Sequence, residues 1–155
     1  VRQAFLFACL CGLRFSDVRR LKWCNLHTDS HGEMVAEIVQ QKTGSLLYLP
    51  ISYEARKQLP PPGTPEDRVF RHLPDASYTC KLLKQWTRAT GVRKHVTFHV
   101  ARHTFATLSL TYGAELYTIS KLLGHSSIRV TQIYAEIISV KKREAVDAIP
   151  PIGGK

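Results

Sequence analysis

Two histidines and an arginine lie close together in the segment FHVARHTFAT, residues 98 to 107. Positions three and four apart share one face of a helix, so His99, Arg102 and His103 would point the same way and their positive charges would repel one another. Such a cluster favours an anion as its partner. Taken alone, the segment fits equally well with His99 as a hydrogen-bonded core residue and Arg102 as a surface arginine.

Three further segments carry polar residues at expected junctions. Arg14, in CGLRFSDVRRL, lies in the break between two expected helices, where a rigid junction presents its side chain. Lys42 lies at the tip of an expected hairpin in QQKTG. In LLGHSSIRVTQIYA, His125 follows a glycine that ends a helix, and Tyr134 comes nine residues later. Three of these residues have a structural alternative: Lys42 as a turn lysine, His125 as a helix C-cap and Tyr134 as a core aromatic residue.

A metal site is not indicated by these residues. His95, His99 and His103 follow at spacing four, but the glutamate of an H-E-x-x-H motif is missing and Arg102 adds a permanent cation. A weaker zinc hypothesis uses a C-x-C pair in an apolar helix, which is not a usual zinc knuckle, and buried thiols explain that pair better. Its ligands would be Cys9, Cys11, Cys24, His27 and His31.

Composition narrows the class of protein. The 155 residues suit one domain, and 22 Lys plus Arg against 12 Asp plus Glu give a net charge of +10. This charge indicates nucleic acid as the first partner and an anionic membrane surface as the second. No apolar run reaches the roughly 20 residues needed to span a bilayer. The scattered cysteines predict a reducing cytoplasm, and the Val start inside an expected helix suggests a piece of a longer polypeptide.

The elements that must position these residues are mostly helical. Residues 1–12 predict a buried helix that ends at Gly12, and Ser16 is expected to cap a short helix over 17–22. EMVAEIVQQKTGSLLYLPI predicts two strands joined near residues 42–45. Further helices are expected over 76–90, 99–111, 115–123 and 127–136.

The expected helix over 76–90 has two distinct faces. The spacing places Leu82, Trp86 and Ala89 on its apolar side. A basic stripe follows another side, where it faces either DNA phosphates or, as commonly, solvent. The stripe consists of Lys81, Lys84 and Arg88.

In order and spacing, GLRFSD, QKTG, HVARHTFAT and LLGHSSIRVTQIYA resemble the catalytic domain of the tyrosine recombinases, also called the phage integrase family. The resemblance runs from Val1 to about Val146 and looks closest to integrases of conjugative transposons and related bacterial mobile elements. It implies a mainly α fold with a small antiparallel β-sheet (α+β). We expect this catalytic domain over residues 1–149, a disordered tail over 150–155, and an upstream core-binding domain that this chain lacks.

The resemblance also implies a reaction. It is site-specific DNA cleavage and rejoining through a 3′-phosphotyrosine link, without metal, cofactor or ATP, in integration or excision of a mobile element. The family's two arginines, lysine, two histidines and tyrosine nucleophile fall on Arg14 and Arg102, Lys42, His99 and His125, and Tyr134.

Elementary chemistry suits these residue types. We expect Arg14 and Arg102 to clamp the scissile phosphate while His125 donates a further hydrogen bond. We expect His99 to accept the proton of Tyr134, and Lys42 to protonate the leaving 5′ oxygen. We expect Asp17 to orient Arg14 or a neighbour through a salt bridge, and His103 either to support the site or only to pack.

The expected partner is a double-stranded DNA recombination site. The resemblance implies that the full-length protein forms a tetramer on DNA through its C-terminal tail, EIISVKKREAVDAI, and that the isolated chain is a monomer in the bacterial cytoplasm, near the nucleoid and not in a membrane. Two alternatives stay open: a type IB topoisomerase, which relaxes supercoils, and a silent DNA-binding module. An intact set of six residues argues against the silent module.

Overall fold

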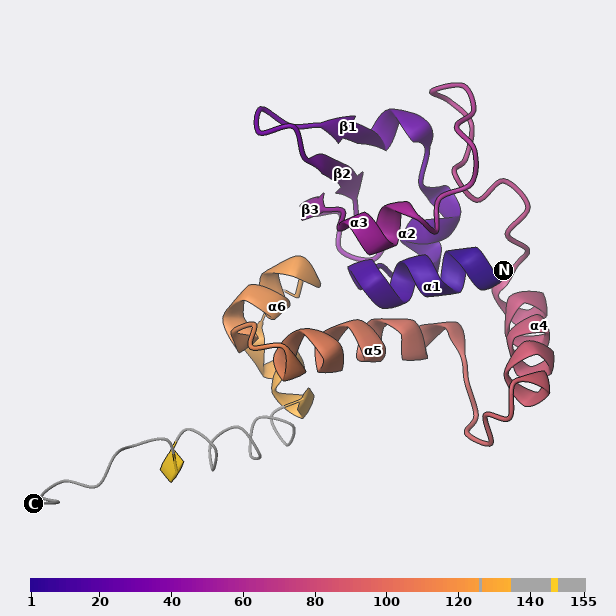
Figure 1. Cartoon of the computed structure of the whole chain (residues 1–155). Coiled ribbons are helices and arrows are strands. Elements are labelled where there is room, and N and C mark those ends of the chain that lie inside the picture. Colours follow the sequence, from indigo (N-terminus) through magenta and orange to yellow (C-terminus); the bar gives the residue numbers. More distant parts are fainter. Residues whose placement is uncertain (126, 135–145, 148–155) are drawn as a thin grey trace, which may run out of the picture.

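The computed structural model describes residues 1–125, 127–134 and 146–147. Within these ranges, a three-stranded sheet and α1 lie on one side of the long helix α5, and α4 lies at the far end from the sheet (Figure 1). The elements are α1 (Arg2–Cys11), α2 (Phe15–Arg20), η1 (Trp23–Asn25), β1 (Leu26–Thr28), β2 (Met34–Val39), β3 (Leu46–Pro50), α3 (Tyr53–Arg56), α4 (Ala76–Ala89), α5 (Phe98–Thr111), α6 (Leu116–Leu122), η2 (Ile128–Val130) and η3 (Gln132–Tyr134).

Helix α1 forms and ends as predicted. Its buried side chains pack against α5 and α3, and the helix stops at Gly12, whose φ of 72° belongs to the left-handed region. A Cβ at this position would lie 2.6 Å from the Phe105 ring and 2.8 Å from the Leu123 side chain. Glycine therefore lets the end of α1 approach α5 and the end of α6 closely.

The start of α2 differs from the expectation. The helix begins at Phe15, with Arg14 as its N-cap residue, and Ser16 lies inside the first turn. Ser16 does not cap it, because the backbone N–H groups of Asp17 and Val18 already bond to the Arg14 carbonyl, both at 3.0 Å. Arg14 thus lies at the entry of a helix that follows the Gly12 stop by only two residues.

The predicted hairpin is confirmed, and a third strand joins it. Strands β2 and β3 pair antiparallel from Val35↔Pro50 to Val39↔Leu46, and β1 pairs with the other edge of β2. Strand β1 was not predicted, because its three residues are too few to show an alternation of apolar and polar side chains. The mainly helical fold with one small antiparallel sheet is confirmed.

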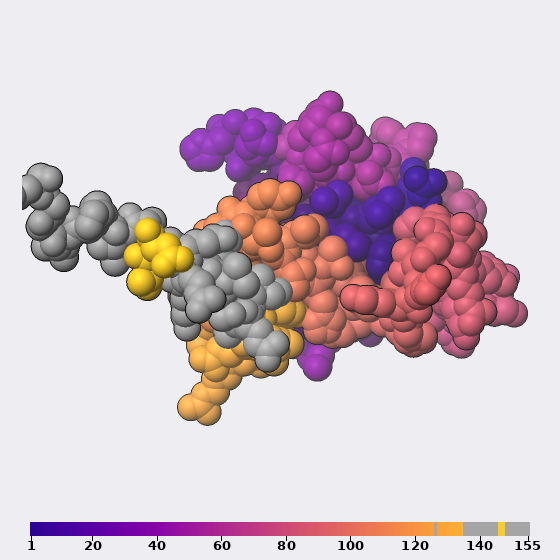
Figure 2. Space-filling model, turned by 60° about the horizontal axis from the view of Figure 1, so that its bottom comes forward, coloured from indigo at the N-terminus to yellow at the C-terminus, as the bar shows by residue number. Residues whose placement is uncertain are grey.

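Helices α4, α5 and α6 also form where predicted, and the predicted apolar side of α4 is correct only in part. Trp86 is half-buried and packs against the core, but Ala89 is exposed, and the buried residues of the helix are Thr79, Leu83 and Thr87. Threonine is tolerated there because each hydroxyl bonds to a backbone carbonyl, Thr87 Oγ1 donating to the Leu83 carbonyl at 2.9 Å. The view of Figure 2 again places α4 and the sheet on different sides of the molecule.

The helix expected over 127–136 is wrong where the structure describes it. Residues 128–134 form two short 3₁₀ turns, η2 and η3, and the Ser127 hydroxyl accepts from the Arg129 N–H at 3.3 Å. These turns bring Tyr134 into a small core cluster with Ala106, Leu110, Ile119 and Leu123. The rest of that expected helix, most of the expected tetramer tail and the expected disordered end at 150–155 lie outside the described residues.

In the described ranges, no helix is both long enough and apolar enough to cross a membrane.

Candidate active site

The six residues predicted for catalysis line one cleft of about 350 Å³. They come from the entry of α2, the β2–β3 turn, α5, the segment after α6 and η3. The tyrosine thus lies in the same cleft as the two arginines of its own chain. The full lining is Arg14, Lys42, Thr43, His99, Arg102, His103, Gly124, His125, Val130, Ile133 and Tyr134.

Arg102 is the most deeply buried cation of the cleft, with 3% of its surface exposed. Its Nη1 donates to the Gly12 carbonyl at 2.8 Å and its Nη2 to the Leu123 carbonyl at 2.6 Å. These carbonyls end α1 and α6, where a positive charge is favourable. Burial, and then the nearby charge of Arg14, lowers the pKa of Arg102 to about 10, so it stays protonated at neutral pH.

Tyr134 contacts a different histidine from the one predicted. Its hydroxyl lies 2.8 Å from Nδ1 of His103, and only 6% of the residue is exposed. The expected partner, His99, is exposed and stacks edge-to-face on His103, with ring centroids 4.6 Å apart. Helical spacing put both rings on one face, but η3 packs over the later turn of α5, so the phenol meets His103.

The cleft shifts the pKa values of these groups. Burial raises the pKa of Tyr134, and the charge of Arg102 opposes that shift. The pKa of His99 is lowered, by burial first and then by the neighbouring His103 and the cations of the cleft. The ring of His125 is held by Thr131, whose Oγ1 lies 2.8 Å from Nδ1. Burial and then Arg102 and Arg14 lower the pKa of His125 to about 4, so it is neutral at pH 7.

Lys42 lies in an exposed turn whose ends are anchored. The Gln40 N–H donates to the Ser45 carbonyl at 2.9 Å, and the Gly44 N–H donates to the Gln40 carbonyl at 2.8 Å. Gly44 has a φ of 67°, which few other residues adopt. These hydrogen bonds therefore fix the two ends of the turn that carries Lys42 at the cleft.

The salt bridge expected for Asp17 is not formed. Asp17 is buried, and its Oδ1 accepts from the backbone N–H of Gln41 at 3.0 Å. No ion pair among the described residues includes it. The first turn of α2 faces the β2–β3 turn, so the carboxylate meets a peptide N–H and ties Gln41, next to Lys42, to the helix that carries Arg14.

Gln40 is a buried residue of the site that the sequence analysis missed. It is 1% exposed and lies between the Arg14 guanidinium and the Gly124 carbonyl. A signal was present: Gln40 continues the inward-facing alternation of Ala36 and Ile38, where a polar side chain is unusual.

The predicted basic stripe is exposed on α4. Lys84 and Arg88 line a groove of about 580 Å³, whereas Lys81 is not among its lining residues. Three more basic side chains of this groove come from the loop that leads into α5. They are Arg93, Lys94 and His95.

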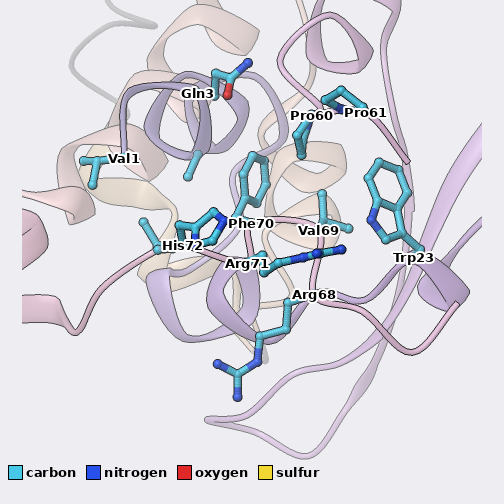
Figure 3. A pocket seen from close by; sticks show the side chains of 12 residues that line it. Val1, Gln3, Trp23, Pro60, Pro61, Arg68, Val69, Phe70, Arg71 and His72 are labelled. Atoms are coloured by element: carbon cyan, nitrogen blue, oxygen red, sulfur yellow. The ribbon is translucent and has the colours of Figure 1, made fainter. Parts of the chain in front are cut away.

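Other places in the described residues do not gather the predicted groups. A cavity of about 240 Å³ near Val1, with Trp23, Phe70 and His72 in its wall, contains none of the six (Figure 3). No group of three or more His, Cys, Asp and Glu side chains in the described ranges lies close enough to hold a metal ion. Burial raises the pKa of the Cys9 thiol to about 11 and of the Cys11 thiol to about 12.

The chain is similar to known proteins in sequence and in structure. The model of the phage integrase family matches residues 1–139. Tyrosine recombinase XerD of Listeria innocua is 31% identical over 151 residues, covering 90% of this chain and 51% of its own length. Tyrosine recombinase XerC of Rhizobium meliloti is 30% identical over 152 residues, covering 91% and 46%. The chain spans about half the length of these relatives.

Solved structures of recombinases share the fold. XerA recombinase superposes with a TM-score of 0.72 at 23% identity, over 97% of this chain and 63% of its own. XerH recombinase bound to a palindromic difH substrate gives 0.71 at 18% identity, over 95% and 45%. The integrase of the Tn1549 transposon, in complex with circular-intermediate DNA, gives 0.63 at 18% identity, over 85% and 52%.

Proposed function

This chain belongs to the phage integrase family, and from that premise we propose that it cleaves and rejoins DNA strands at specific sites through a covalent link between Tyr134 and a 3′ phosphate. One observation carries the proposal: Tyr134 lies in the same cleft as two arginines, a lysine and the histidines. We propose that the reaction serves integration or excision of a mobile element.

The two arginines provide positive charge opposite the negatively charged phosphodiester. A phosphodiester is an anion, and attack places more negative charge on its non-bridging oxygens. Two of the five N–H groups of Arg102 are engaged by backbone carbonyls, which hold the side chain rigidly while its other donors serve the phosphate. Arg14 supplies the second cation. With Nδ1 of His125 facing Thr131, Nε2 is the nitrogen that donates to a phosphate oxygen.

The proposed reaction has an acceptor for the proton of Tyr134 and a donor for the leaving 5′ oxygen. The hydroxyl oxygen of Tyr134 lies 2.8 Å from Nδ1 of His103. In the proposed reaction the hydroxyl donates to this nitrogen, and His103 takes the proton as the phenolate oxygen bonds to phosphorus. In this scheme His103, and not His99, is the proton acceptor. The bond from phosphorus to the 5′ oxygen breaks, and Lys42 gives that oxygen a proton. A 5′ hydroxyl attacks in the reverse reaction, so the energy of the broken bond is conserved in the phosphotyrosine and no ATP is consumed.

Double-stranded DNA is the proposed substrate and partner. The groove formed by α4 and the loop that leads into α5 carries further basic side chains outside the cleft. We propose that the duplex backbone follows this groove, with affinity that falls with salt. Assembly of a tetramer in the cytoplasm, near the nucleoid, through the C-terminal tail remains part of the proposal.

The test is covalent trapping without metal or ATP. The chain is incubated with chelator and a randomised pool of nicked duplexes. After cleavage the short fragment that carries the 5′ hydroxyl diffuses away, so the covalent intermediate cannot be rejoined and accumulates. The expected product is a DNA-linked protein, mapped to Tyr134 by mass spectrometry and absent in Tyr134→Phe. Transfer of the link to a second duplex separates a recombinase from a topoisomerase. No adduct, from this chain or from one joined to the expected upstream domain, although both bind DNA, would overturn the proposal and leave the silent module.

A further inference from the structure

We infer that Gln40 is a positioning residue for the reaction, one that fixes the guanidinium of Arg14 relative to the turn of Lys42 and the backbone beside His125. The inference rests on the proposed function, because it assigns Gln40 a role in presenting Arg14 to the scissile phosphate. Gln40 makes its effect through Arg14 and does not touch the substrate.

The amide of Gln40 bonds to three parts of the site. With its oxygen toward Arg14, it accepts from Nη1 at 2.9 Å, and its nitrogen lies 3.3 Å from the Gly124 carbonyl and 3.0 Å from Thr43 Oγ1. In the reverse orientation Nε2 donates to the Leu123 carbonyl at 3.3 Å and Oε1 accepts from Thr43 Oγ1 at 3.0 Å. We assign the amide with its oxygen toward Arg14, because the reverse points amide N–H groups at guanidinium N–H groups. One side chain thereby joins the entry of α2, the β2–β3 turn and the end of α6.

The Gln40 amide lies directly against the backbone of Gly124. A Cβ on Gly124 would lie 2.5 Å from the Gln40 amide, and Gly124 has a φ of 62°. The glycine therefore ends α6 and at the same time makes room for the amide. Arg14 is a long side chain with several rotatable bonds, and a buried acceptor at 2.9 Å removes much of that freedom before DNA arrives.

The substitution Gln40→Met tests this role, since it keeps the length of the side chain and removes both hydrogen-bonding functions. We expect the rate of covalent trapping to fall by about 30-fold or more, as expected for losing a preorganised contact to the developing charge, while the Kd for duplex DNA changes by less than about 3-fold. Gln3→Met, the same change at an exposed residue near the start of α1, is the matched control and is expected to react like the wild type.

A methylphosphonate at the scissile position distinguishes positioning from folding. Replacing one non-bridging oxygen by methyl leaves one developing charge where the phosphodiester has two, so one well-held arginine is sufficient. For the diastereomer whose methyl group faces Arg14, the Gln40→Met defect is expected to shrink to within about 3-fold of the wild type. An equally large defect with both diastereomers would mean that Gln40 acts through folding and would overturn the inference.

A second variant covers the case in which Gln40→Met does not fold. Thr43→Val removes the hydroxyl partner of Gln40 from an exposed turn, and we expect slower trapping that the same methylphosphonate relieves. Wild-type rates in Gln40→Met, or in Thr43→Val if only that variant folds, would overturn the inference while leaving the proposed function intact. Absence of an adduct from the wild type, both as this chain and joined to the expected upstream domain, although both bind DNA, would instead overturn the proposed function.

Discussion

The hydroxyl oxygen of Tyr134 lies 2.8 Å from Nδ1 of His103, a residue 31 positions earlier in the chain. This contact holds the proposed nucleophile within the cleft and pairs it with an imidazole that can accept its proton. It also separates the two histidines of α5: His103 contacts the phenol, and His99 lies behind it, nearer to solvent.

The first prediction concerns these two histidines. His103→Gln keeps a hydrogen-bond acceptor but cannot take the proton, so we expect covalent trapping to slow by about 100-fold or more. His99→Gln should slow it less. Single-turnover trapping rates measure both, with the exposed His72→Gln as the control that should match the wild type. A larger loss in His99→Gln than in His103→Gln would return the role of proton acceptor to His99.

The second prediction concerns the ionisation of Tyr134. Burial raises its pKa above the ordinary value of about 10, and the charge of Arg102 compensates for only part of this. In a spectrophotometric titration of phenolate absorbance, the difference between wild type and Tyr134→Phe should therefore appear at a pH above that of an ordinary tyrosine. A difference that appears at pH 10 or below would show that the arginines outweigh burial.

The third prediction links His125 to acid stability. In the unfolded chain a histidine titrates near pH 6.5, whereas the pKa of the folded residue is about 4. Between these values the unfolded chain binds more protons, so the contribution to stability is complete above about pH 6.5 and is lost as the pH falls toward 4. The lowered pKa of His99 acts in the same direction.

Urea unfolding at several pH values between 7 and 4 measures this effect. The free energy of unfolding should decline less steeply in His125→Asn than in the wild type. Parallel pH dependences in the two proteins would contradict the prediction.

The fourth prediction assigns Arg102 a role in stability in addition to catalysis. Arg102→Met should lower the free energy of unfolding by about 2 to 4 kcal/mol, because it leaves the Gly12 and Leu123 carbonyls buried without their donors. Arg88→Met, at an exposed position of α4, should change it by less than about 0.5 kcal/mol. Chemical denaturation measures both; equal stability of the two variants would show that water replaces the guanidinium at no cost.

The fifth prediction concerns the basic groove. If DNA phosphates occupy it, the double variant Lys84→Gln, Arg88→Gln should reduce the slope of log K against log salt by about 2, roughly one unit for each lost contact. The matched control is Lys57→Gln with Arg71→Gln, two exposed cations already paired with Glu54 and Asp67 at 2.7 and 2.9 Å. Equal losses of slope in the two double variants would indicate only a general effect of net charge.

Local patterns in the sequence were sufficient to predict much of the secondary structure. The apolar run that ends at Gly12, the hairpin around Lys42 and the helix that carries Arg102 all follow from periodicity and turn chemistry, because each depends on neighbours within a few residues. The failures were also local: β1 is too short for a pattern, and the segment after Ser127 forms 3₁₀ turns where its spacing favoured a helix.

Contacts between distant residues decided how the site is built. The residue types and their spacing predicted the six catalytic groups. They did not predict that Arg102 would donate to carbonyls 90 and 21 positions away, or that Asp17 would accept from the peptide N–H of Gln41. Helical periodicity places His99 and His103 on one face and cannot say which of them meets Tyr134. That choice, and the burial of Gln40 beside Arg14, depend on how α5, η3 and the hairpin pack together, and packing is a property of the whole chain.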